Sequence, residues 1–414
     1  MDMVNIQNRT VYRWYIVASG LCLMALSIGV INNCFALFTI PVTEELGFTR
    51  REFAVNQTLL FVTTMTVTPR VGTAIRKTGL LNGLRIAAVL LAVVYFCYAL
   101  ATRLWQFYVI SALLGVLMPF VTTVPLSILV GEWFERDLGL ALGIVFMGSG
   151  IGGMVFNPVA TLFIQKASWR FAFGAIAVMM LLILVPLVFL VIKEAPKDRP
   201  ADQRTTSKAK VKVNEPTRLT GESFAKDLKT IRFWAYMLMG LLMGAGTYTI
   251  INFTSTYLQD TGYSAYFAAT VTAISMGGMA VGKLFLGKMY DFLGVRITSL
   301  ISALFLALGM LGASFMGWPG AVVLIVLGGS LGCPLGTIAP PLLIRRIFGT
   351  RAYSDKLSLM VACDNLGAAI TPIIAGALYE YTGSYCFMYR LLLLVMLVLL
   401  VCLAVLLPGK DAEL

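Results

Sequence analysis

Charged residues divide this chain into long uncharged stretches, and this division limits the folds that are open to it. A helix needs about 20 mainly apolar residues to cross a lipid bilayer. The pattern therefore predicts a series of membrane-spanning helices, in the uncharged runs 14–43, 53–69, 86–102, 104–131, 138–165, 171–192, 233–259, 261–282, 297–344, 365–379 and 391–409.

Two of these runs need a closer reading before the helices can be counted. The run 297–344 is long enough for two helices, and the turn residues 317–320 (Gly-Trp-Pro-Gly) lie in its middle. The run 365–379 is too short alone, so its helix must include Asp364 and begin near Lys356. The sequence thus predicts an all-α membrane protein with twelve transmembrane helices.

The composition agrees with a membrane protein and excludes several kinds of site. Hydrophobic residues make up 59% of the chain and charged residues only 13%, whereas soluble domains carry about 25% charged residues. Histidine is absent, and the seven cysteines lie in apolar runs without a C-x-x-C pair. We expect no metal site, no cofactor and no disulfide framework. Without a P-loop or a nucleophile–histidine pair, neither ATP-driven transport nor an enzyme is expected.

The positive charges indicate how the chain is oriented. Arg9 and Arg13 precede the first apolar run, which at 30 residues is too long for a signal peptide. With the N-terminus inside, 26 lysines and arginines fall on the inner side, and this asymmetry predicts a multi-pass cell-membrane protein with both termini cytoplasmic. The net charge of +12 then reflects topology rather than nucleic-acid binding. Only six cations fall outside: Arg50, Arg51, Arg103, Lys166, Arg170 and Arg390.

One long polar segment separates the chain into two halves. Residues 194–231 contain three prolines and alternating lysines, and they are typical of a flexible linker on the inner face. We therefore expect an N-terminal six-helix unit over residues 1–193 and a C-terminal six-helix unit over 232–414. Residues 224–234 at the linker's end are interpreted as the start of helix seven rather than as an amphipathic surface helix.

The two halves share a loop motif, G-x-x-x-(D/R)-x-x-G, in copies 215 residues apart. The second copy resembles the loop signature of the major facilitator superfamily, which implies two pseudo-symmetric six-helix bundles that alternate access to a central site. In that family the acid caps a helix and pairs with a cation to hold one conformation shut. The first copy has Arg76 in the acidic place, so this half either lacks a latch or has Arg76 answered by Glu135 or Asp137. The motif positions are Gly72, Arg76 and Gly79 in the first copy and Gly287, Asp291 and Gly294 in the second.

Two further stretches are similar to a narrower group. Residues 132–152 contain Trp-Phe-x-Arg, L-A-L-G and G-S-x-x-G, and residues 376–385 read G-A-L-Y-E-Y-T-G-S-Y. They resemble monocarboxylate transporters and their bacterial oxalate/formate-exchanger relatives. In those proteins an arginine four residues before the loop glycine binds the substrate carboxylate, and here that position is Lys283. The resemblance implies substrate contact, and the alternative is that Lys283 snorkels to the inner interface.

Asp364 is the deep carboxylate in the predicted membrane helices. The symporters of the resembled family carry a proton-binding acid four residues before the arginine, but here that position is Met279. Asp364 is therefore the candidate for proton coupling, because intramembrane acids are functional candidates by default. The alternatives are an ion pair with Lys283 and a structural hydrogen bond to an inner helix end.

Uncharged polar residues complete the candidate binding site. Asn32 and Asn33 can donate hydrogen bonds to a carboxylate or bond a neighbouring helix. Arg70 is either an interface anchor or a second anion contact. The remaining substrate-binding candidates are Thr122, Tyr248, Asn252 and Asn365.

These features predict a secondary transporter that moves a small carboxylate, with a monocarboxylate favoured, by proton-coupled symport. One intramembrane cation can balance one carboxylate, whereas a dicarboxylate suits two. The alternatives are an electroneutral anion exchanger, an efflux carrier and a non-transporting membrane receptor. The expected partners are the carboxylate, protons and the lipid bilayer.

Overall fold

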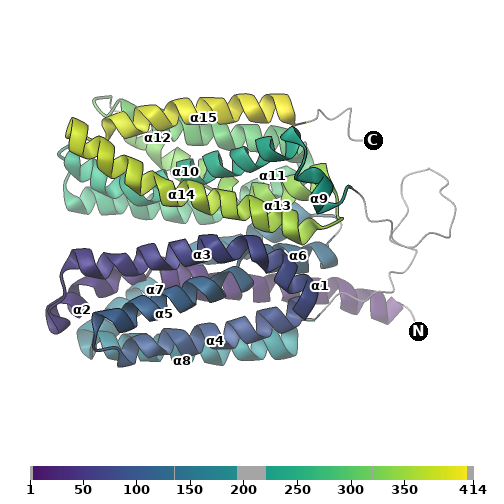
Figure 1. Ribbon diagram of the computed structural model, residues 1–414, viewed down its shortest axis with the longest axis horizontal. Coiled ribbons are helices and arrows are strands. Elements are labelled where there is room, and N and C mark those ends of the chain that lie inside the picture. The colour runs from purple at the N-terminus through teal and green to yellow at the C-terminus, as the bar shows by residue number, and fades with distance from the viewer. Residues whose placement is uncertain (1–2, 135, 194–220, 319, 408–414) are drawn as a thin grey trace.

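The computed structural model describes residues 3–134, 136–193, 221–318 and 320–407, and within these ranges it contains helices and no strand. Figure 1 shows the helices running lengthwise in two layers, with both chain ends at one end of the molecule, called here the terminal end. One layer contains α1 (Met3–Met24), α2 (Thr39–Leu46), α3 (Arg50–Thr78), α4 (Leu80–Leu100), α5 (Leu104–Leu117), α6 (Thr123–Trp133), α7 (Leu138–Lys166) and α8 (Trp169–Pro186). The other contains α9 (Phe224–Asp227), α10 (Ile231–Asp260), α11 (Ala265–Ser314), α12 (Ala321–Leu327), α13 (Leu335–Phe348), α14 (Tyr353–Thr382) and α15 (Cys386–Leu406).

The helices account for the twelve predicted membrane passes. Among the described residues, ten helical spans are long and apolar enough to cross a membrane. One of them, in α11, contains two passes, because Gly294 has a φ of 82° and turns the chain inside this 50-residue helix. The twelfth pass is α3, which runs the length of its layer but is rich in threonine (Figure 1). The all-α membrane fold is thus confirmed.

The turn predicted inside the run 297–344 is also present. Helix α11 ends at Ser314 and α12 begins at Ala321, although Pro319 lies outside the described residues. Helix α14 begins at Tyr353, three residues before the expected start. The three additional residues include Asp355, an acid in the first turn of the helix that forms an ion pair described below.

Four of the described passes contain a segment that is not α-helical, and in one of them this is a π-helical end, over Leu187–Val191 after α8. Helix α1 continues into a π-helical segment over Ala25–Asn32. A 3-10 turn over Met118–Phe120, which contains Pro119, separates α5 from α6. A π-helical segment over Gly328–Gly332 separates α12 from α13. Irregular backbone at membrane depth is tolerated where protein buries it or where it lines a cavity, so these breaks direct attention to the middle of the molecule.

The end of the linker folds differently from the expectation. Residues 224–234 are not simply the start of helix seven, because α9 ends at Asp227 and α10 begins only at Ile231. The ammonium of Lys356, which is fully buried, lies 2.6 Å from a carboxylate oxygen of Asp227. This ion pair holds the single turn of α9 against α14.

Candidate functional site

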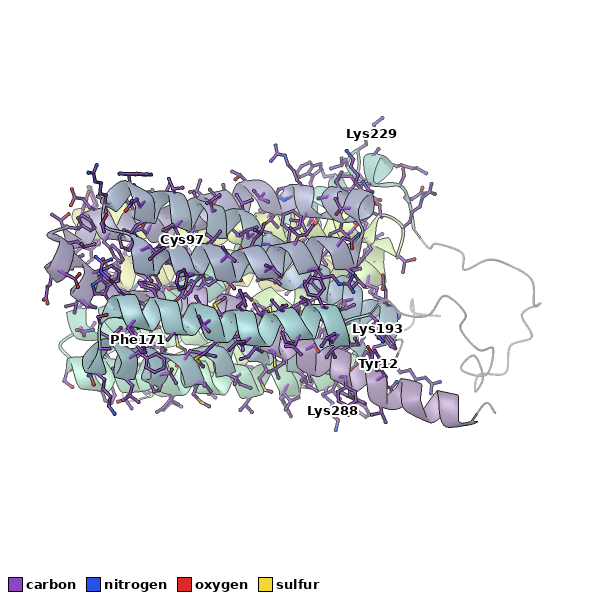
Figure 2. The ribbon with its side chains drawn as sticks, turned by 90° about the horizontal axis from the view of Figure 1, so that it is seen from below. Tyr12, Cys97, Phe171, Lys193, Lys229 and Lys288 are labelled. Atoms are coloured by element: carbon purple, nitrogen blue, oxygen red, sulfur yellow. The ribbon has the colours of Figure 1, made fainter. Side chains whose placement is uncertain are left out.

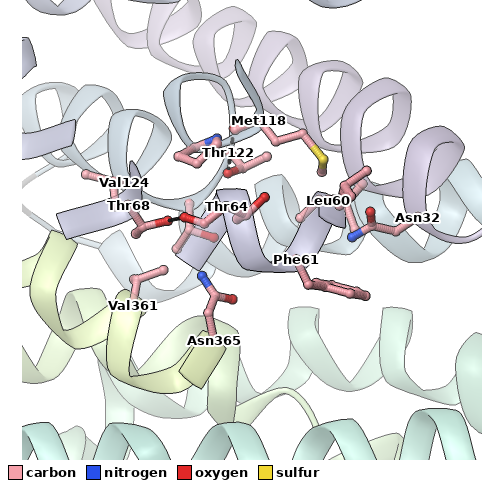
Figure 3. A pocket seen from close by; sticks show the side chains of 13 residues that line it. Asn32, Leu60, Phe61, Thr64, Thr68, Met118, Thr122, Val124, Val361 and Asn365 are labelled. Carbon is pink, nitrogen blue, oxygen red and sulfur yellow. Dashed lines mark hydrogen bonds between the residues drawn. The ribbon is translucent and has the colours of Figure 1, made fainter. Parts of the chain in front are cut away.

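A polar cavity, called here the central cavity, lies between the two layers. It has a volume of about 90 Å³, and its walls come from the π-helical segment after α1, from α3 and α14, and from the break between α5 and α6 together with the first turn of α6. Figure 3 shows Asn32, Thr64, Thr68, Thr122 and Asn365 around it. Three of the predicted substrate-binding residues are therefore brought together here: Asn32, Thr122 and Asn365.

The polar groups of the central cavity are neutral. The hydroxyls of Thr64, Thr68 and Thr122 donate to backbone carbonyls at 2.6 to 3.1 Å, which leaves their oxygens free to accept. The amide oxygen of Asn32 is buried without a hydrogen-bond partner. Among the lining residues there is no charged side chain. This cavity suits the uncharged part of a small polar molecule.

The cation of the site lies at the boundary between the layers. Lys283 on α11 is only 2% exposed, and its ammonium donates to the hydroxyl of Ser149 at 2.9 Å and to the carbonyl of Phe146 at 3.2 Å. Both partners belong to α7 in the other layer. The ammonium thus points across the layer boundary rather than along α11 to the interface. These two hydrogen-bond partners are neutral, and burying a charge without an opposite charge beside it costs free energy.

Asp364 is the second ionisable group of the site. One of its carboxylate oxygens, Oδ1, is buried and has no hydrogen-bond partner. Its backbone packs tightly on α10, because a Cβ on Gly244 would lie 1.9 Å from the carbonyl oxygen of Asp364. No ion pair between Asp364 and Lys283 is recorded in the described part of the chain. The two side chains are therefore not paired with each other in this conformation.

Other sequence candidates lie outside the cavity lining. The amide of Asn33 donates to the carbonyl of Ser149 at 3.0 Å, which is the interhelical bond that was the alternative for it. The ring of Tyr248 lies edge-on against Phe61 of the other layer, 6.1 Å between centroids. The exposed Asn252 donates to its own helix, and so does the exposed Arg70. Thr64, Thr68 and Ser149 were not singled out as site residues, because their role depends on helix positions that the sequence alone does not fix.

The first loop motif contacts the opposite layer at the terminal end. Arg76 forms an ion pair with Asp355 in the first turn of α14. The hydroxyl of Thr73 donates to the same carboxylate at 3.1 Å, and the backbone N–H of Gly72 donates to Ser358 at 2.9 Å. The acid that pairs with Arg76 in this conformation thus comes from α14 and not from Asp137, the second of the two expected partners. Glu135 itself lies outside the described residues.

The second loop motif makes the corresponding contact with the first layer. The carboxylate of Asp291 accepts hydrogen bonds from the backbone N–H groups of Gly139 at 2.8 Å and Leu140 at 2.7 Å, at the start of α7. An acid at a helix N-terminus satisfies unpaired donors and the helix dipole. Both motifs therefore link the layers at the terminal end, one with its own acid and one with its arginine.

The glycines of the two motifs have matching roles. A Cβ on Gly72 or on Gly287 would lie 2.4 Å from a backbone oxygen of the other layer. Gly79 and Gly294 have φ values of 84° and 82°, which strain any residue with a side chain. The repeat found in the sequence is therefore a repeat of backbone geometry, with a charge reversal in the first copy.

Comparison with known proteins agrees with this architecture. The family model described as Major Facilitator Superfamily matches residues 18–279 and, in a second match, residues 259–413. Monocarboxylate transporter 12 of Homo sapiens is 23% identical over 394 residues, which cover 90% of this chain and 76% of that protein. The MFS-type transporter hasB of Aspergillus fumigatus is 24% identical over 397 residues, 90% of this chain and 85% of that protein.

Solved structures share the fold at lower identity. The proton:xylose symporter XylE superposes with a TM-score of 0.75 at 14% identity, over 95% of both chains. The E. coli fucose:proton symporter FucP superposes with a TM-score of 0.69 at 12% identity, over 95% of this chain and all of that chain. The predicted resemblance to a superfamily of transporters, rather than to an enzyme, is confirmed.

Proposed function

We propose that this chain, which belongs to the Major Facilitator Superfamily, moves a small organic monoanion across the cell membrane together with a proton. A monocarboxylate is the class that fits best. The observation that carries the proposal is the buried ammonium of Lys283. At the layer boundary it donates hydrogen bonds to a carbonyl and a hydroxyl, both of them neutral. A buried cation in this state gains most from an anion, and one cation balances one carboxylate.

Substrate binding at Lys283 has a direct mechanical consequence. Its ammonium now bonds Ser149 and Phe146 on α7, so it ties α11 in one layer to α7 in the other. A substrate carboxylate that takes these donors releases that tie. Binding and the movement of the two layers are thereby coupled, because a ligand shifts a conformational equilibrium only through contacts that differ between the states.

Asp364 supplies the proton in this proposal. A carboxylate and Lys283 together are neutral, and so is protonated Asp364. The substrate carboxylate, Lys283, Asp364 and the bound proton then carry no net charge together. A neutral loaded site costs less free energy in the low-dielectric interior while the layers move. The buried Oδ1 without a partner supports this role, because a proton placed there needs no existing hydrogen bond to be broken.

The relatives support the same class of function. The name of the human relative points to monocarboxylates, and the titles of the two solved structures point to symport with protons. The uncharged central cavity lies between the same two layers, and we propose that it forms a further part of the substrate path. The cations Lys193, Lys229 and Lys288 lie towards the terminal end in Figure 2, which supports cytoplasmic termini under the positive-inside rule.

Uptake into proteoliposomes tests the proposal. A panel of labelled carboxylates is presented with and without an inward proton gradient to wild type, Lys283→Gln and Lys288→Gln. Lys288 is an exposed cation on the same helix and serves as the matched control. We expect gradient-driven uptake of a monocarboxylate that falls at least tenfold in Lys283→Gln and persists in Lys288→Gln.

Other outcomes identify other functions. Saturable carboxylate exchange without any response to pH would indicate an electroneutral exchanger. Ligand binding without flux would indicate a receptor. Uptake that survives in Lys283→Gln would exclude Lys283 from the substrate site.

A further inference from the structure

The surroundings of Asp364 carry a more specific inference, which rests on the proposed function. Three helices meet at this side chain. Its own helix α14 packs backbone to backbone on α10 at Gly244. One turn further along α10 is Thr247, and the first turn of α13 contains Gly336.

Gly336 lies between the two polar groups of this junction. A Cβ built on Gly336 would lie 3.1 Å from the hydroxyl oxygen of Thr247 and 3.3 Å from the partnerless Oδ1 of Asp364. The Thr247 hydroxyl and Oδ1 of Asp364 therefore both lie next to Gly336, and no side chain at position 336 separates them. The Thr247 hydroxyl at present donates to the carbonyl of Met243 at 2.7 Å, and it can rotate towards another acceptor.

The break in the tenth pass places the start of a helix at the same point. Helix α13 begins at Leu335, directly after the π-helical segment and Pro334, and it runs for 14 residues. The N–H groups of Thr337 and Ile338 donate to the carbonyl of Pro334 at 3.2 and 3.0 Å, so only those of Leu335 and Gly336 precede the first hydrogen bonds of the helix. The N-terminus of a helix carries partial positive charge. The partnerless oxygen of Asp364 is the second, independent sign that this helix start serves a charged group.

We propose that Thr247 and Gly336 position Asp364 for proton coupling. The Thr247 hydroxyl and the first turn of α13 stabilise the carboxylate after the proton leaves, and the missing side chain at position 336 keeps the three groups within reach. A mid-membrane carboxylate then needs no ion pair with Lys283. Lys283 stays available for the substrate anion.

Two thiols lie at this junction, whereas the charged groups of the neighbouring helices are engaged elsewhere. Cys363 is the neighbour of Asp364 on α14, and the buried thiol of Cys333 donates to the backbone carbonyl of Thr247 at 3.8 Å. On the elements packed against α14, Tyr248 of α10 faces Phe61, Arg345 of α13 donates to Gly131, Arg70 of α3 donates to Thr66, and Arg76 of α3 pairs with Asp355.

The pH dependence of uptake in proteoliposomes, measured with the monocarboxylate found above, tests the inference. The variants are Gly336→Ala and Thr247→Val. The controls are Thr247→Ser, which keeps the hydroxyl, and Gly240→Ala. A Cβ on Gly240 would be equally crowded, 3.1 Å from a backbone oxygen of Met360, and its three nearest atoms include the Cβ of Cys363 but no atom of Asp364 or Thr247.

We expect the midpoint of the pH profile to move to higher pH by about one unit in Gly336→Ala and Thr247→Val, because the carboxylate form loses stabilisation. Exchange of substrate across the membrane without a proton gradient stays within about twofold of wild type, and both controls keep the wild-type midpoint. A wild-type midpoint in both test variants, or an equal shift in Gly240→Ala, overturns the positioning role. A wild type without pH dependence overturns the proposed symport itself, and the two failures are thereby distinguished.

Discussion

At the scale of single residues, Ser149 decides how tightly the empty site holds its cation. The Ser149 hydroxyl accepts from Lys283 at 2.9 Å and competes with any substrate carboxylate for the same ammonium. A hydrogen bond to a charged donor contributes roughly 1.5–3 kcal/mol. The loss in Ser149→Ala is smaller than this, because the hydrogen bond from Lys283 to the Phe146 carbonyl remains. We therefore expect Ser149→Ala to lower the apparent KM for the substrate about threefold to tenfold, measured as the concentration dependence of counterflow.

A matched serine controls for the loss of a buried hydroxyl. Ser314 is also buried, and its hydroxyl donates only to its own helix at the carbonyl of Met310. Ser314→Ala should leave KM unchanged. A raised KM in Ser149→Ala would mean that Ser149 binds the substrate instead of competing with it.

At the scale of helices, the ion pair between Arg76 and Asp355 joins α3 to α14. Asp355 is 2% exposed, whereas half of the Arg76 side chain is exposed. Removing the partner of a buried charge is costly, at about 3–5 kcal/mol for a fully buried pair, and the exposure of Arg76 reduces this figure. We expect Arg76→Asp and Asp355→Arg each to lower the initial rate of uptake at least tenfold, because like charges then meet at the latch.

The charge-swapped double variant tests whether the pairing itself matters. Arg76→Asp combined with Asp355→Arg should recover uptake to within about threefold of wild type. Arg70→Asp serves as the control, since Arg70 is exposed on the same helix and donates to the carbonyl of Thr66 within that helix. A double variant as inactive as the single ones would show that the two positions do not act through their mutual attraction.

Local signals in the sequence are sufficient to identify helices and their caps. The spacing Thr49-x-x-Glu52 is a capping box in the structure, with both reciprocal bonds at the start of α3. The glycines that close the two loop motifs have positive φ values, as their spacing at helix ends favours. These features depend on residues within one turn of each other, so the sequence contains all that determines them.

Contacts between distant segments could not be predicted in the same way. The sequence places Asp355 near the start of a helix, but it does not show the partner of this acid. The pairing with Arg76, 279 positions away, depends on how α3 and α14 lie together. The central cavity likewise depends on the break at Pro119, which the uncharged run 104–131 concealed. The charge reversal in the first motif was visible, whereas the residue that compensates for it was not.

At the scale of the whole molecule, the two layers touch backbone to backbone at the terminal end. A Cβ on Gly287 of α11 would lie 2.4 Å from the carbonyl oxygen of Gly139 on α7. Neither group is a flexible side chain, so the layers themselves must separate to accept a methyl group. We expect Gly287→Ala to shift the molecule towards the conformation that is open at this end, and roughly 1.4 kcal/mol suffices for a tenfold change in the ratio.

The distance between spin labels at the exposed positions Lys77 and Lys288, one in each layer, measures this shift in a background without the native cysteines. The population of long distances should grow at least tenfold in Gly287→Ala. Gly277→Ala is the matched control, because a Cβ at that position of the same helix meets nothing within 4 Å. If both variants keep the wild-type distances, the close approach of α7 and α11 does not hold the terminal end shut. The Arg76–Asp355 pair and the hydrogen bonds of Asp291 to the start of α7 are then the contacts to test next.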